Sequence, residues 1–195
     1  MSEYIADRDS PIAVATTSST EQICDPSVRR EHYRQLLSET CEQFGETHVP
    51  DIVLWLQDSW SEIRKDCARW IRQNLPKITS DAGKLLFNNL IYCIRCGTFS
   101  WQALHGSLLG ITELITENSE NVSDIVRTLC LNLVGSSLAP VREAATACIA
   151  KLVISKQIST AVLISTILSS ITSLNGKYTM HMPISSNLLS LLLLS

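Results

Sequence analysis

Three stretches of the chain carry apolar residues at helical spacing, and the three can be aligned with one another. Their apolar positions are Trp60, Ile63, Cys67 and Trp70; then Trp101, Leu104, Leu108, Ile111 and Ile115; then Leu138, Val141, Ala145, Cys148 and Leu152. The steps alternate between three and four, which places each set on one face of an α-helix. Leu104 follows Ile63 by 41 positions and Val141 follows Leu104 by 37, so the pattern recurs about every 40 residues.

A second set of positions runs beside the first in the same register. It contains Arg64, Ala68, Ile71 and Leu75; then His105, Leu109 and Thr112; then Arg142, Thr146, Ile149 and Val153. Each helix is therefore apolar over an arc that is too wide for a single packing partner. Stacked helical hairpins cover such a helix on two sides, because each repeat lies between two neighbours.

Another helical stretch precedes each of these three helices. These first helices are predicted over residues 50–57, 81–96 and 121–135, with Pro50 in a first turn and Ser80 or Asp81 as a cap. Residues 156–174 would form the first helix of a fourth hairpin. Residues 28–44 would form a helix before the first hairpin, capped by Asp25 or Ser27. We find no convincing strand, so the pattern predicts an all-α protein.

Two of the aligned stretches resemble HEAT repeats, which carry an Asp between their two helices and Val-Arg near the start of the second. The matching positions are Asp58, Ile63, Arg64 and Cys67 in "DSWSEIRKDCA", and Pro140, Val141, Arg142 and Ala145 in "SSLAPVREAA", where Ser136 replaces the Asp. The middle stretch departs, with Phe99 at the Asp position and His105 at the Arg position. The "SWQALHGSLLGI" segment is also similar to HEAT repeats of tubulin-folding cofactor D and of Mot1-type TBP-removing ATPases.

This resemblance spans about Val49 to Leu174 and implies a right-handed α-solenoid of about three to four stacked HEAT-like hairpins. It implies structural roles between repeats for Asp58, Arg64, His105 and Arg142, with the Asp–Arg link absent from the middle junction. We expect a disordered N-terminal arm over residues 1–26 and a helical repeat domain over 27–174. Residues 175–195 then form a loop and an apolar C-terminal segment, which we interpret as a truncated further helix.

Composition and charge narrow the class of protein. Hydrophobic residues make up 45% of the chain, and the net charge of −3 is too small to favour capture of nucleic acid or of an anionic membrane. The seven cysteines occur without a signal peptide, which predicts reduced thiols in the cytoplasm or nucleus. The longest uncharged run, 157–176, is rich in Ser and Thr, so we interpret it as a buried helix and expect no membrane span.

No motif with catalytic or metal-binding spacing emerges. Cys93 and Cys96 lack the second ligand pair of a zinc site, and the four histidines (His32, His48, His105 and His181) are scattered. Gly106 and Gly110 lie four apart on one helix, which indicates close approach of another helix. We therefore predict no enzymatic activity, no cofactor and no small-molecule substrate.

A basic stripe of Lys65, Arg69 and Arg72 lies along one helix. Interleaved acidic residues favour a solvated face over a nucleic-acid surface, but the stripe is also a candidate protein-binding patch. We predict a non-enzymatic scaffold or adaptor that mediates protein–protein interaction as part of a larger protein or complex. The alternative is a non-catalytic regulatory arm or subunit of an enzyme assembly, such as a chromatin or TBP-type ATPase, a tubulin-folding cofactor or an RNA-modifying enzyme activator. Whether the gene continues past Ser195 into a catalytic domain would distinguish them.

Overall fold

The computed structural model describes residues 25–39, 44–96, 100–115, 123–155, 159, 161–162 and 164–165. Its elements, in order, are α1 (Pro26–Glu39), η2 (Glu46–His48), α2 (Val49–Leu56), α3 (Ser61–Asn74), η3 (Leu75–Lys77), α4 (Ser80–Cys96), α5 (Trp101–Leu114), α6 (Ser123–Val134) and α7 (Ala139–Ile154). Throughout these residues the only β pairing is an isolated bridge between Phe44 and Ile78. The predicted all-helical class is confirmed.

Several expectations fall on other parts of the chain. The described residues exclude nearly all of the expected arm (1–26), most of the fourth hairpin's helix (156–174) and all of the C-terminal segment (175–195). They also exclude Phe99. None of the described helices is long and apolar enough to cross a membrane.

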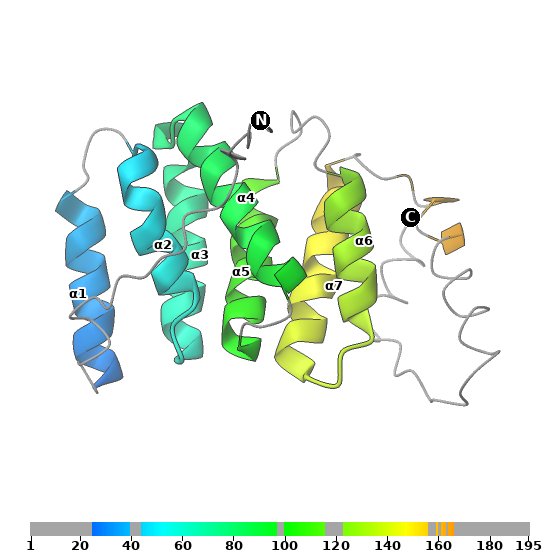
Figure 1. The fold of residues 1–195 in the computed structure, drawn as a ribbon, viewed down its shortest axis with the longest axis horizontal. Coiled ribbons are helices and arrows are strands. Elements are labelled where there is room, and N and C mark those ends of the chain that lie inside the picture. Colours follow the sequence, from blue (N-terminus) through cyan, green and yellow to red (C-terminus); the bar gives the residue numbers. More distant parts are fainter. Residues whose placement is uncertain are drawn as a thin grey trace, which may run out of the picture.

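The helices from α2 to α7 are arranged in two rows (Figure 1). One row consists of α2, α4 and α6, and the other consists of α3, α5 and α7. Within each successive pair, α2 packs on α3, α4 on α5 and α6 on α7. Between pairs, α3 packs on α5 and α5 on α7, while α2 contacts α4 and α4 contacts α6. The second helix of the middle pair, α5, is therefore covered by its own partner and by both neighbouring second helices.

Burial along the second helices follows the aligned apolar positions. Ile63, Cys67, Leu108, Val141 and Leu152 are fully buried. Leu104, which aligns with Ile63 and Val141, packs against the core and is partly buried. Trp101 and Leu138 are 39% and 43% exposed, because each lies at the start of its helix, where the apolar face runs out beyond the neighbouring helices.

The starts of the helices reflect local hydrogen bonding. Asp25 Oδ1 accepts a 2.7 Å hydrogen bond from the amide of Ser27, which caps α1 as predicted. The predicted cap of α4 was wrong by one residue: Thr79 Oγ1, not Ser80 or Asp81, accepts from the amide of Ala82 at 3.3 Å.

The predicted extent of the first helix, 28–44, was also wrong at its C-terminal end. The helix α1 ends at Glu39. Phe44 instead lies beside η3, where its amide donates to Lys77 O and its carbonyl accepts from the amide of Thr79, both at 3.0 Å. Phe44 is 1% exposed and its ring packs edge-on against Trp70, with the ring centroids 5.4 Å apart. It therefore belongs to the core and not to a helix.

The two glycines of α5 mark its closest approach to α2. A Cβ atom at Gly106 would lie 1.6 Å from the carbonyl oxygen of Leu56, and one at Gly110 would lie 2.7 Å from Leu56 Cδ1 and 2.9 Å from Leu90 Cδ1. The predicted packing role of Gly106 and Gly110 is confirmed, because a side chain at Gly106 would overlap backbone.

Candidate protein-interaction site

Arg64 joins the first helix pair to the second through its guanidinium. Its Nε donates to Nδ1 of His105 on α5 at 3.0 Å, and its Nη1 donates to the carbonyls of Asp58 and Ser59 at 2.6 and 2.9 Å. The same guanidinium lies 5.3 Å from the ring centroid of Trp101, and Arg64 is only 1% exposed. A buried arginine thus binds its own turn and the next pair at once.

Arg142 repeats half of this arrangement on α7. Its Nη1 donates to the carbonyls of Ser136 and Ser137 at 2.7 and 3.3 Å, six and five residues back, as in Arg64. His105 occupies the aligned position on α5 and accepts a hydrogen bond from Arg64. The middle junction, where the sequence predicted no Asp–Arg link, is therefore held by an Arg–His hydrogen bond.

Asp58 contacts a different element from the one expected. Its carboxylate accepts from Arg29 of α1 at 3.0 and 3.2 Å and from the amide of Trp60 at 2.8 Å. Only its backbone carbonyl meets Arg64. The side chain of Asp58 therefore ties the turn to α1, while Arg64 ties it to α5.

The environment of His105 keeps its imidazole neutral. Burial, followed by the charges of Arg64 and Lys65, lowers the pKa of His105 from 6.5 to about 4. A neutral ring can accept the hydrogen bond of Arg64 at Nδ1, whereas an imidazolium cannot. Burial also lowers the pKa of Arg64, against the opposing charge of Asp58, but arginine remains a cation at any physiological pH.

The predicted basic patch of Lys65, Arg69 and Arg72 is exposed, but its three side chains do not share one environment. Lys65 Nζ pairs with Glu62 at 2.9 Å, and Arg69 Nη1 pairs with Asp66 at 2.7 Å. Arg72 instead lines a cavity at the far end of α3. Two of the three charges are thus paired along their own helix, and Arg72 faces a concave surface.

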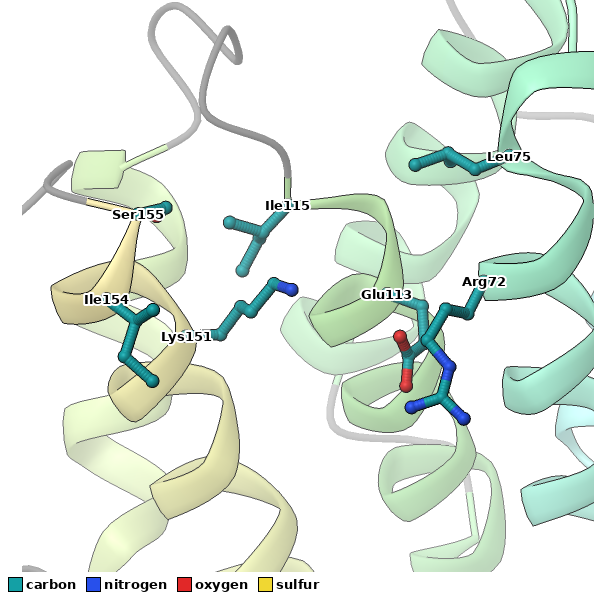
Figure 2. Close-up of a pocket in the computed structure, with 7 residues that line it drawn as sticks. All are labelled: Arg72, Leu75, Glu113, Ile115, Lys151, Ile154 and Ser155. Atoms are coloured by element: carbon teal, nitrogen blue, oxygen red, sulfur yellow. The ribbon is translucent and has the colours of Figure 1, made fainter.

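This cavity, which we call the Arg72 groove, has a volume of about 300 Å³ and lies across the ends of three helices. It is lined by Arg72, Leu75, Glu113, Ile115, Lys151, Ile154 and Ser155. Figure 2 shows these residues at the C-terminal ends of α3, α5 and α7. The groove combines two cations and one carboxylate with apolar side chains, of which Ile154 is 70% exposed.

Sequence reasoning identified Arg72 but not Glu113 or Lys151. The available signal was that all three lie near the ends of the aligned second helices, one on each. How far those ends project relative to one another depends on the stagger of packed helices, which the pattern does not specify.

The cysteines of the described segments are reduced, and most are buried. Cys93 accepts a hydrogen bond from Gln57 Nε2 at 3.2 Å, and burial raises the pKa of its thiol. Burial likewise raises the pKa of Cys67 well above the ordinary value. Among the residues that the structure describes, no three His, Cys, Asp or Glu side chains are grouped so as to hold a metal ion. His32 and His48 make ring contacts with Tyr33 and Phe44, and His181 lies outside the described part.

Comparisons with protein-family models, with curated proteins and with solved structures find no match to this chain.

Proposed function

We propose that this chain is a non-enzymatic scaffold or adaptor of the HEAT type, built as a right-handed α-solenoid, and that it binds a partner protein along α3, α5 and α7. The observation that carries the proposal is the uninterrupted contact from α3 to α5 to α7, with the Arg72 groove across their ends. Stacked helices offer an extended surface of shallow contact sites, which suits protein recognition better than catalysis.

The chemistry of the groove supports a protein partner. Arg72 and Lys151 supply two cations against one carboxylate, Glu113, and Ile154 presents exposed apolar surface beside them. Charged groups around an apolar patch are typical of the rim and centre of a protein–protein contact. The free thiols of the described cysteines support action in the cytoplasm or nucleus.

The experiment is a quantitative capture from cells with the full chain as bait. We expect a set of proteins to be retained by the wild-type chain and lost with Arg72→Glu/Lys151→Glu, because reversal of both cations removes the groove's attraction for an anionic partner. The matched control is Lys84→Glu on α4, an exposed lysine that lies 3.9 Å from the carboxylate of Asp81. Identical captures by the groove variant and the control would contradict the proposal.

A further inference from the structure

The first helix is attached through one charged and aromatic face. Arg29, Arg30, Tyr33 and Arg34 fall within a single arc of α1, at spacings of one, four and five residues. All four contact α2, α3 or the turn between them. Figure 1 places α1 at the N-terminal end of the two rows, beside α2 and α3.

Two buried carboxylates receive the arginines of this face. Asp58 binds Arg29 through both of its oxygens, and its side chain is 5% exposed. Asp66, whose side chain is 6% exposed, accepts from Arg30 and, at 3.2 Å, from Arg34. Burial opposes ionisation of Asp66, but the hydrogen bond from Arg30 and the neighbouring guanidinium charges prevail and lower its pKa. Asp66 is therefore charged, and the carboxylates of both Asp58 and Asp66 are oriented toward α1.

An aromatic contact completes the surface under α1. The ring of Tyr33 stacks on that of Trp55, with centroids 5.5 Å apart and an interplanar angle of 16°. Trp55 is 2% exposed, and its Nε1 is buried without a hydrogen-bond partner among the described residues.

The attachment of α1 differs in kind from the packing of the other helices. The helix pairs with extensive backbone contact are formed among α2 to α7 and do not include α1. Tyr33 is buried, but Val28 and Leu36 on α1 are 52% and 36% exposed. The side chains of Arg30 and Arg34 are 31% and 51% exposed, so salt screens their ion pairs with Asp66, and these pairs contribute little on their own. The helix is therefore held by contacts that a competitor of the same chemistry can replace.

We propose that α1 is a displaceable cap and that the surface of Trp55, Asp58 and Asp66, which we call the α1 site, docks a basic amphipathic helix of a partner protein. The occupant is argued from charge complementarity: two buried carboxylates beside an aromatic ring fit arginines and an aromatic residue at the spacing that α1 itself carries. The inference rests on the proposed scaffold function, since it names one class of partner, but it concerns a site that is separate from the Arg72 groove.

The probe for this proposal is a fluorescent peptide with the α1 sequence, 26–39, titrated into the full chain. The key variant is Arg30→Glu/Arg34→Glu, which repels α1 from Asp66 but leaves the α1 site intact. If α1 occupies the site nine-tenths of the time, freeing the site raises the apparent affinity for the peptide about tenfold. Binding should weaken as salt is raised, and a peptide with its three arginines replaced by glutamine should not bind.

Two control variants make the result decisive. Asp66→Asn introduced into the Arg30→Glu/Arg34→Glu chain should remove the gain, with circular dichroism verifying that the helices remain. Arg72→Glu/Lys151→Glu should bind the peptide as the wild-type chain does, which separates this test from that of the groove. Equal affinity of the wild-type and Arg30→Glu/Arg34→Glu chains, or binding by neither, would overturn the proposal. A wild-type dimer that dissociates in Arg30→Glu/Arg34→Glu would also overturn it, because α1 would then be exchanged between two copies.

Discussion

Replacing Gly106 by alanine tests the close contact between α5 and α2. The added Cβ would lie 1.6 Å from the carbonyl oxygen of Leu56 and 2.7 Å from its carbonyl carbon, so the backbones of α5 and α2 must separate. Alanine gains about 1 kcal/mol of helix propensity over glycine. Overpacking in a dense core costs about 1–3 kcal/mol or more, and a backbone obstacle cannot rotate away as a side chain can. Because the obstacle is backbone, we place the cost at the upper end of that range and expect a net loss of about 2 kcal/mol in the free energy of unfolding.

Two other glycines provide matched comparisons. A Cβ at Gly83 in α4 would meet only Ile78 Cγ2, at the ordinary distance of 3.8 Å, so Gly83→Ala should stabilise by about 0.5–1 kcal/mol. At Gly110 the obstacles are the ends of Leu56 and Leu90 side chains, at 2.7 and 2.9 Å, which can move. Gly110→Ala should therefore lie between the other two variants.

The measurement is guanidinium-induced unfolding of the full chain, followed by far-ultraviolet circular dichroism. The expected order of stability is Gly83→Ala, wild type, Gly110→Ala and Gly106→Ala. The reasoning would be refuted if Gly106→Ala unfolded within about 0.5 kcal/mol of the wild type, which is the usual range for substitutions without a specific contact. A larger loss at Gly110 than at Gly106 would equally show that α5 does not approach α2 at Gly106.

Further predictions concern the buried polar link and the core. The depressed pKa of His105 means that the unfolded chain takes up a proton below pH 6.5 and the folded chain only below about 4. Stability should therefore fall by about 3 kcal/mol as pH falls across that window, and urea titrations of His105→Gln should lack that contribution. Arg64→Ala should cost about 3 kcal/mol and the half-buried Arg142→Ala only about 1 kcal/mol, with equal losses in urea unfolding arguing against the link to α5. Phe44→Ala should reduce the free energy of unfolding by about 3–5 kcal/mol, and Leu36→Ala, at a more exposed position, by less than about 0.5 kcal/mol. Similar shifts in melting temperature for the two variants would contradict the burial of Phe44.

The helices were predictable because burial itself produces the spacing of three and four. Ile63 and Val141 are fully buried at aligned positions of α3 and α7, as their pattern indicated. Phe44 was misplaced, since its partners Ile78 and Trp70 lie more than twenty residues away and no local pattern reveals them. The cap of α4 was misplaced by one residue, because Ser, Thr and Asp stand together there and only backbone geometry decides among them.

The sequence singled out several residues of the candidate sites but did not reveal which residues they contact. The family pattern singled out Asp58, Arg64 and His105, and all three take part in the junctions around α3. It did not reveal that Asp58 binds α1, because the arginines of α1 resemble a solvated charged face in sequence. Nor did it reveal the Arg72 groove, whose other charges come from helix ends brought together only by packing.

The alternation of arginine, histidine and arginine along the second helices restricts how the protein can be rearranged. Arg64 needs an acceptor on the next helix, and His105 provides one. Excising the middle helix pair would place Arg142 opposite Arg64, and two guanidiniums cannot accept a hydrogen bond from each other. The three pairs are therefore not interchangeable modules, because deletion of the middle pair would leave the buried Arg64 facing a second guanidinium in place of its acceptor.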